Sequence, residues 1–254
     1  MRNHSRKMDL LLGSLALRPY VFLFLAAFVV AGVRDLGWAR TLLFGGIVWP
    51  IAWLAEFAST RIGIPFGLYH YTGLTRGREL YIADVPFFDS LSFTFLAYAS
   101  LCLARRALAA RPASLGATAL LAGLLMMMLD IVIDPIAVRG DRWFLGRIFY
   151  YPDGGVYFGV PLSNFVGWWL VGAVAVAAYA VCAGPAAVRG RPATGIALYY
   201  AVLGFNLAVA GWIAEWWVLA AGLALHVALA GVLWMMARRT PEPGVLDTRG
   251  MQRA

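Results

Sequence analysis

Seven runs of predominantly apolar residues, separated by more polar connectors, dominate the hydropathy pattern of the chain. A helix that crosses the hydrocarbon core of a bilayer needs roughly 20 apolar residues. Runs of about this length occupy residues 19–33, 39–58, 86–104, 113–133, 164–183, 193–213 and 216–237. The pattern predicts an all-α fold, a polytopic membrane bundle of about seven transmembrane helices.

The two ends of the chain differ from this apolar region. The first 18 residues combine a basic start with a short apolar run that Arg18 interrupts, and no A-x-A cleavage site follows. They predict an uncleaved amphipathic arm over residues 1–18, ahead of a membrane-embedded catalytic domain over residues 19–237. Residues 238–254 predict a flexible, solvated C-terminal tail.

The connectors between the apolar runs are unequal in length. Those at 34–38, 105–112 and 184–192 are short and mostly basic, whereas 59–85 and 134–163 are long and rich in Gly, Pro, Tyr and acids. With seven alternating spans, both long connectors fall on the same face as the N-terminus. Long loops are often functional, and such dense aromatic residues argue against disorder, so we expect the active face there.

Composition and charge agree with a membrane location. The AVILMFWYC set makes up 62% of the 254 residues and only 13% are charged, against roughly 25% in an ordinary soluble domain. The net charge of +8 comes from 21 Lys and Arg against 13 Asp and Glu. Because the bases lie in connectors, where they anchor helices to lipid headgroups, we expect a membrane and not a nucleic acid as the partner.

Several enzyme classes lose support from residues that the chain lacks. The three histidines, His4, His70 and His226, fall in different segments, whereas di-iron oxygenases need clustered imidazoles. Cys102 and Cys182 lie inside apolar runs without a CxxC pattern, which predicts packing roles. GxGxxG, P-loop and GxSxG motifs are also missing. We therefore expect no metal and no cofactor.

Acidic residues at the ends of the apolar runs are the main candidates for chemistry, because an ionisable group within a span is costly. Glu56 lies near the end of the second run and Asp89 near the start of the third. Asp130 and Asp134 end the fourth run with a spacing of i,i+4, which places both on one side of a helix. Pro135 is expected to end that helix where the second long connector opens.

Two like charges one turn apart at low dielectric disfavour each other, so one aspartate of the pair is expected to keep its proton near neutral pH. A carboxylic acid of this kind suits general-acid catalysis. Asp130, Asp134 and Glu56 are therefore candidate catalytic residues. The alternative is structural, with one aspartate pairing with Arg139 or Arg142 to fix the loop.

The second long connector is dense in aromatic residues from Phe149 to Trp169, with Gly and Pro at turn positions. These rings can line a pocket for a flat polyene and stabilise a transient cation through their faces. The alternative is an ordinary interfacial aromatic belt. Ser163 or Asn164 is expected to cap the helix that follows.

Several segments occur in an order that is typical of one family. Glu56 is followed by Ile64-Pro-Phe-Gly67-Leu-Tyr69-His-Tyr71 and then by Val85-Pro86. Next come Asp130-x-x-x-Asp134-Pro135 and Tyr157-Phe-Gly-Val-Pro161-Leu-Ser-Asn164-Phe-x-Gly167-Trp168. Together they resemble the membrane carotenoid 1,2-hydratase family, which includes acyclic carotene and bisanhydrobacterioruberin-type hydratases. The resemblance covers about residues 45–172, and the chain departs from the family pattern at 87–90 and 150–155.

The resemblance implies a reaction. Such a hydratase protonates the terminal C1=C2 double bond of an acyclic carotenoid end group and adds water to the tertiary cation, without a cofactor. The resemblance implies Asp130 or Asp134 as the proton donor, with the other aspartate and Glu56 orienting water. The expected substrate-binding residues are Tyr69, Tyr71, Asp89, Tyr157, Asn164 and Trp168.

Two other functions fit parts of the sequence. An intramembrane prenyltransferase can bind a Mg-diphosphate with a DxxxD motif at a helix end, although such enzymes use two acidic motifs and this chain has one. A non-enzymatic carotenoid or lipid carrier is the second alternative. In every case we expect a multi-pass protein of the cell membrane with its carotenoid or other isoprenoid in the bilayer, and we consider contacts with other carotenoid-pathway enzymes.

Overall fold

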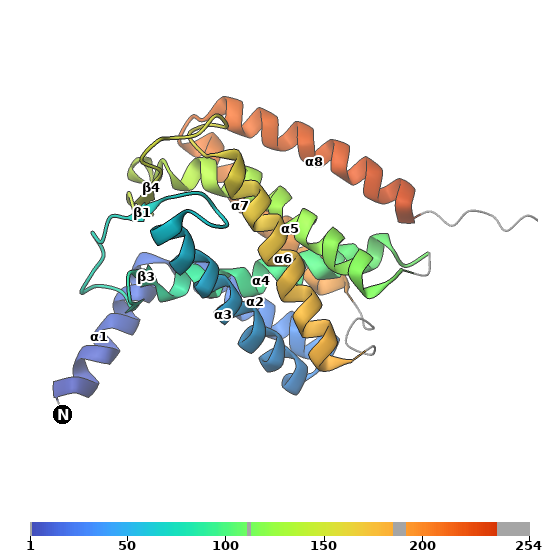
Figure 1. Ribbon diagram of the computed structural model, residues 1–254, viewed down its shortest axis with the longest axis horizontal. Coiled ribbons are helices and arrows are strands. Elements are labelled where there is room, and N and C mark those ends of the chain that lie inside the picture. The colour runs from blue at the N-terminus through green and yellow to red at the C-terminus, as the bar shows by residue number, and fades with distance from the viewer. Residues whose placement is uncertain (1, 111–112, 185–191, 238–254) are drawn as a thin grey trace, which may run out of the picture.

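Seven long apolar helices form the body of the molecule in the computed structural model, which describes residues 2–110, 113–184 and 192–237 (Figure 1). They are α2 (Pro19–Leu36), α3 (Trp38–Ile62), α4 (Phe87–Ala107), α5 (Leu115–Ala137), α6 (Leu162–Ala183), α7 (Ala193–Trp212) and α8 (Trp216–Ala237). Each is long and apolar enough to cross a membrane, so the predicted multi-pass, all-α bundle is confirmed.

An additional helix, α1 (Arg2–Leu17), precedes the bundle and projects away from it (Figure 1). Its last turns contact the first long loop, where the Leu80 amide donates to Ser14 Oγ at 3.2 Å. The division into an arm, a catalytic domain and a tail stays a prediction, and the tail over 238–254 lies outside the described residues.

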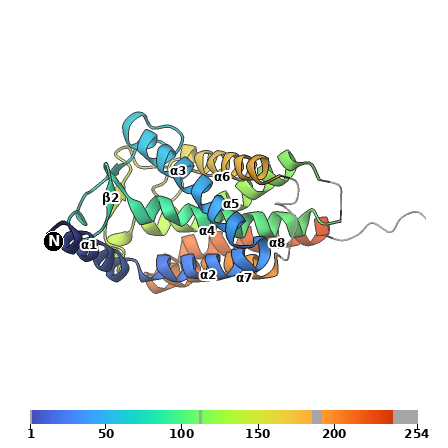
Figure 2. The ribbon, with the colours of Figure 1, turned by 90° about the horizontal axis from the view of Figure 1, so that it is seen from below.

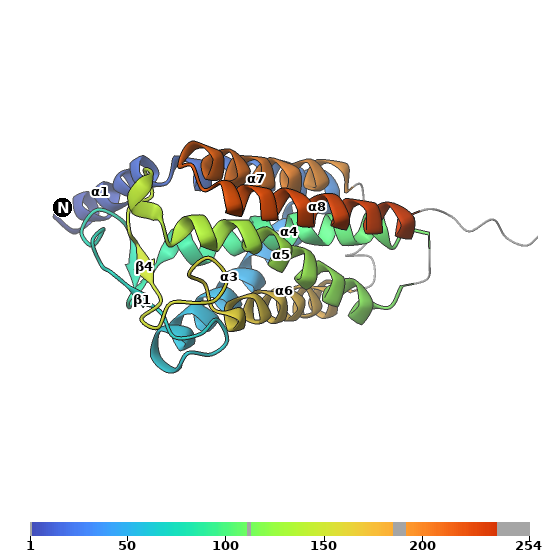
Figure 3. The same ribbon diagram turned by 90° about the horizontal axis from the view of Figure 1, so that it is seen from above.

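Both long loops lie at the same end of the bundle as α1, and α8 ends at the opposite end (Figure 3), as alternating spans require. Short strands join the loops: β1 (His70–Tyr71) pairs antiparallel with β4 (Phe149–Tyr150), and β2 (Tyr81–Ile82) pairs with β3 (Val85–Pro86). The β1–β4 pair places Tyr71 opposite Phe149. Two loops far apart in the sequence therefore form one cover over the end of the bundle.

Helix α4 is the centre of the bundle, surrounded by α2, α3, α5 and α7 (Figure 2). Fifteen of its 21 residues are buried, against four of the 22 residues of α8. Hydroxyl groups near its start bond within the helix, since Ser90 donates to the Phe87 carbonyl at 3.2 Å and Thr94 to the Leu91 carbonyl at 2.7 Å. The buried Ser100 Oγ has no hydrogen-bond partner among the described residues. The alanine, serine and threonine residues of this central helix let its neighbours pack closely.

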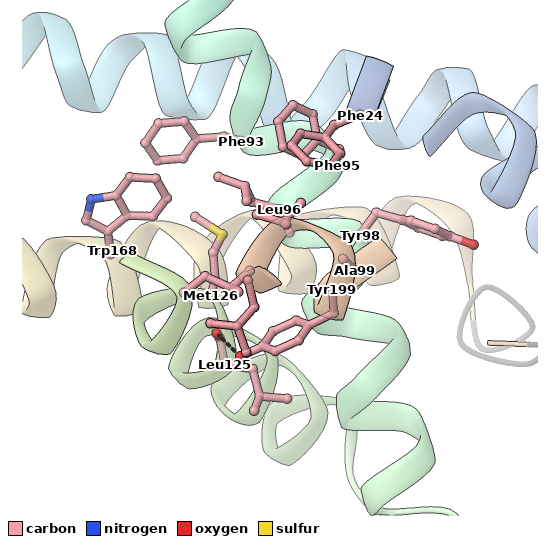
Figure 4. Close-up of a cluster of buried hydrophobic side chains, with 14 of the residues drawn as sticks. Phe24, Phe93, Phe95, Leu96, Tyr98, Ala99, Leu125, Met126, Trp168 and Tyr199 are labelled. Carbon is pink, nitrogen blue, oxygen red and sulfur yellow. Dashed lines mark hydrogen bonds between the residues drawn. The ribbon is translucent and has the colours of Figure 1, made fainter. Parts of the chain in front are cut away.

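Aromatic rings fill the core around α4 (Figure 4). Phe93 of α4 stacks on Trp168 of α6 with ring centroids 4.2 Å apart and an interplanar angle of 10°. On the other side of the core the Tyr199 hydroxyl donates to the Leu125 carbonyl at 3.0 Å. These contacts fix the relative positions of α4, α5, α6 and α7 beneath the loops.

Two local expectations are wrong. Pro135 does not end α5, which continues to Ala137, because a proline removes one backbone donor without preventing the next residues from staying helical. Neither Ser163 nor Asn164 caps α6, which begins at Leu162 without a side-chain cap. The Asn164 side chain instead points into the bundle, where a carboxyl group accepts its hydrogen bond.

A buried ion pair connects α2 to α4 near the end of the bundle that lies opposite the two long loops. The Arg105 guanidinium contacts Asp35 through Nη1–Oδ2 at 2.7 Å and Nη2–Oδ1 at 3.1 Å. We expect Asp35→Asn to lower the free energy of unfolding by about 3–5 kcal/mol, because it leaves a buried charge unpaired. Unfolding in detergent micelles, followed by circular dichroism, measures this loss.

The matched control is Asp84→Asn, which removes a carboxylate from an exposed ion pair with Arg61. We expect this control to change stability by less than about 1 kcal/mol. Equal losses from the two variants would contradict a structural role for the buried pair.

Candidate active site

A cavity with three carboxyl side chains on its wall lies beneath the two long loops. Glu56 of α3, Asp89 of α4 and Asp134 of α5 face it. Most of the remaining wall is aromatic or aliphatic, with rings from Tyr20, Phe24, Phe66, Tyr69, Tyr71, Phe93, Phe95, Trp143, Phe149, Tyr151 and Trp168. The cavity thus combines acid groups with an apolar, aromatic surface.

The structure brings most of the predicted site residues together. Besides the three carboxyls, the predicted residues Tyr69, Tyr71, Asn164 and Trp168 line the cavity. Asp130 is not on the wall and lies fully buried behind it.

Tyr157 is the predicted substrate-binding residue that the structure places elsewhere. It does not line the cavity, because the turn that pairs it with Val160 packs its ring against Phe158 and Phe165, with centroids 4.7 and 5.3 Å away. Residue type and proximity in sequence could not reveal this orientation.

The predicted aspartate pair forms a cluster with α6 and the second loop. Asn164 Nδ2 donates to Asp130 Oδ2 at 2.6 Å, and the Tyr151 hydroxyl donates to Asp134 Oδ2 at 3.3 Å. The carboxyl groups of Asp130 and Asp134 also contact each other. The i,i+4 spacing therefore places one carboxyl in the cavity and the other directly behind it.

The structural alternative for this pair does not match the contacts. Arg139 Nε lies 3.1 Å from Glu215 Oε1, and Arg142 pairs with the same carboxylate. Both arginines also donate to backbone carbonyl oxygens, those of Phe158 and Ile213 respectively. Neither arginine forms an ion pair with Asp130 or Asp134 among the described residues.

A second polar cluster surrounds Glu56. The Tyr71 hydroxyl oxygen lies 3.1 Å from Glu56 Oε1 and 2.9 Å from Asp89 Oδ2. On its other side, Asp89 Oδ1 accepts from Arg18 Nη1 at 3.0 Å, while Arg18 Nε donates to Glu79 Oε2 at 2.7 Å. Burial by itself lowers the pKa of Arg18, but Asp89 and Glu79 outweigh it and raise that pKa, so the guanidinium stays charged.

Three loop tyrosines connect the two clusters. The Tyr69 ring contacts those of Tyr71 and Tyr151, with centroids 5.4 and 5.8 Å away. Burial, together with nearby carboxylates, raises the pKa of all three phenols. Each tyrosine therefore keeps its hydroxyl proton at neutral pH and can donate it in a hydrogen bond.

Sequence reasoning missed Arg18 and Tyr151. Arg18 was visible as a charge that interrupts an apolar run, and Tyr151 as part of an aromatic run, but neither signal pointed to a carboxyl partner. Among the described residues, no group of three or more His, Cys, Asp or Glu side chains is arranged to hold a metal ion.

The fold and the cavity define a class: a multi-pass membrane protein with an acidic, aromatic cavity near one end of its bundle. The family model described as "Carotenoid biosynthesis protein" matches residues 17–237. The chain belongs to this family, and the resemblance seen in the sequence is confirmed.

A curated relative is named bisanhydrobacterioruberin hydratase, from Haloarcula japonica, and is 34% identical over 167 residues. The match covers 64% of this chain and 54% of the relative, so the chain spans about half the length of the relative that it matches. No solved structure matches the chain.

Proposed function

We propose that the chain is a carotenoid hydratase, a hydro-lyase that adds water across the terminal C1=C2 double bond of an acyclic carotenoid end group. The product is a tertiary 1-hydroxy carotenoid. The observation that carries this proposal is the presence of Glu56, Asp89 and Asp134 on the wall of one aromatic cavity. The name of the curated relative, a hydratase, supports the same reaction.

The cavity supplies what acid-catalysed hydration needs. A carboxylic acid gives a proton to the electron-rich alkene, and a second carboxyl group takes a proton from the attacking water. The tertiary cation that forms between these steps is stabilised by aromatic faces such as those of Phe93 and Trp168 and by a carboxylate. The two rings line the same cavity as the carboxyl groups of Glu56, Asp89 and Asp134.

Much of the cavity wall suits a hydrocarbon. Its apolar lining includes Phe24, Leu96 and Val202, from α2, α4 and α7. A carotenoid is about as long as the hydrocarbon core is thick, roughly 30 Å, so its end group reaches the loop end while its polyene stays in the bilayer. We place the protein in the cell membrane, and contacts with other carotenoid-pathway enzymes stay a prediction.

The origin of the product hydroxyl tests the reaction. Membranes containing the chain and lycopene are incubated without oxygen, with a chelator, in water enriched in ¹⁸O and deuterium. We expect mass spectrometry to find solvent ¹⁸O in the new hydroxyl and solvent deuterium on the neighbouring carbon, because both parts of water add to the double bond.

Three other results would refute the proposal. An absolute requirement for dioxygen would indicate an oxygenase, and a strict requirement for magnesium with diphosphate release would indicate a prenyltransferase. Binding of carotenoid without a new product would indicate a carrier.

A further inference from the structure

Two buried carboxyl groups each have an oxygen atom without a hydrogen-bond partner among the described residues. These atoms are Glu56 Oε2 and Asp130 Oδ1. A buried carboxylate that lacks a donor is costly, whereas a neutral carboxyl group tolerates one unsatisfied oxygen much better. Each of the two groups also has a neighbouring carboxyl. Asp89, beside Glu56, has more hydrogen-bond donors than Glu56. Asp134, beside Asp130, faces the cavity, whereas Asp130 is fully buried.

The Tyr71 hydroxyl decides the direction of hydrogen bonding in the first pair. It lies within hydrogen-bond distance of both Glu56 and Asp89 but has only one proton to donate. Asp89 is ion-paired with the buried Arg18, which favours its carboxylate form. Tyr71 therefore donates to Asp89 and accepts a hydrogen bond from Glu56, which must then carry a proton.

In the second pair, the carboxyl group on the cavity wall is the one without the proton. Asp134, on the wall, accepts a hydrogen bond from Tyr151 and contacts the Asp130 carboxyl behind it. If Asp130 holds the proton of this pair, its Oδ2 still accepts from Asn164, and Asp134 is left as the carboxylate. The cavity then has a proton-bearing carboxyl on one wall and a carboxylate on another.

We propose, on the basis of the proposed hydration, that Glu56 is the acid and Asp134 the base of the reaction. Glu56 gives its proton to C2, whose π electrons form the new C–H bond and leave a cation at C1. Water forms a C–O bond to C1 and loses one proton to Asp134. These roles reverse those that the family resemblance implies.

The resting state then requires one proton to return to Glu56 and one to leave Asp134. Tyr71 lines both the inner cavity and a polar outer cleft formed with Thr60, Arg61, His70, Arg76 and Asp84. Its hydroxyl is therefore placed to give its own proton to Glu56 and to take a replacement proton from water in the cleft. Asp134 releases its proton to water in the cavity. Arg18 and Asp89 are positioning residues that act through Tyr71.

Deuterium exchange separates the acid from the base. Membranes with lycopene are incubated in heavy water with wild type, Glu56→Gln or Asp134→Asn, and Asp153→Asn, at an exposed loop position, is the control. We expect Asp134→Asn to form at least 100-fold less alcohol but to return lycopene that carries deuterium at its end group. Glu56 still protonates the alkene in that variant, and the uncaptured cation loses a proton again.

For Glu56→Gln we expect neither alcohol nor exchange, since an amide cannot supply the proton. Exchange that survives in Glu56→Gln and is lost in Asp134→Asn would overturn the assignment, and so would loss of exchange in both variants. If wild type itself forms no alcohol with solvent oxygen, the proposed hydration fails, which is a different result from a reversed exchange pattern.

Tyr71→Phe tests the return of the proton, because it keeps the ring that packs on Tyr69 and removes the hydroxyl. We expect steady-state turnover to fall about 10- to 100-fold, while the first turnover, which uses the proton already on Glu56, falls much less. Equal losses in single-turnover and steady-state measurements would overturn the relay and leave Tyr71 as a structural contact.

Discussion

Asp130→Asn and Asp134→Asn are each expected to lower hydration at least 100-fold, within the range of about 10²–10⁴ that general acid–base groups contribute. An amide fills the same space but cannot exchange a proton, and in the Asp130 variant Asp134 loses the carboxyl that contacts it. The measurement is the amount of 1-hydroxy carotenoid formed per amount of membrane-inserted protein in a host that makes lycopene.

Two further variants calibrate this result. Asp89→Asn is expected to have a milder effect, because the hydrogen-bond link from Asp89 to Glu56 runs through Tyr71. Asp153→Asn, in the same loop as Tyr151 and exposed, is expected to leave turnover unchanged. Near-normal turnover in both aspartate-pair variants would reassign that pair to a structural role.

Gly123→Val is expected to lower the free energy of unfolding by about 3 kcal/mol, the upper range for overpacking a well-packed core. A Cβ atom at Gly123 would lie 2.3 Å from the Trp169 carbonyl oxygen and 2.7 Å from the Ala173 amide nitrogen. Because these are backbone atoms of α6, only separation of α5 from α6 relieves the clash. Unfolding in detergent measures stability, and product formation measures the site.

Activity should fall with stability in this variant, because the Asn164 to Asp130 hydrogen bond crosses the same interface. The matched control is Gly204→Val on α7, where a Cβ atom would have no neighbour within 4 Å. Gly204→Val changes the intrinsic helix propensity by the same amount as Gly123→Val but introduces no clash. Similar losses in the two variants would show that propensity, and not close packing of α5 on α6, causes the effect.

The boundaries of the helices illustrate what could be predicted and where prediction fails. Hydrophobic length located all seven spans, since a segment that crosses lipid must be apolar over nearly its whole length. The expectations at Pro135 and Asn164 were wrong because they used local rules on helix ends, whereas tertiary contacts determine where α5 ends and what Asn164 binds. Asn164 lies in the first turn of α6 and bonds across the bundle to Asp130 in place of capping its own helix.

The sequence by itself determined the membrane class, the seven spans, the shared face of the two long loops and, through the ordered motifs, the family. It also selected Glu56, Asp89 and Asp134 as candidates, because a carboxyl group in an apolar run is costly and therefore conspicuous. These properties depend on composition and on order along the chain.

Only the tertiary structure decided which candidates meet. Pairing of β1 with β4 brings Tyr71 and Tyr151 over the same cavity, and Arg18 reaches Asp89, a residue 71 positions away. The same packing places Asp130 behind Asp134 and turns Tyr157 away. Side-chain contacts between distant segments depend on how helices and loops pack in three dimensions, and no periodicity or motif along one chain specifies that geometry.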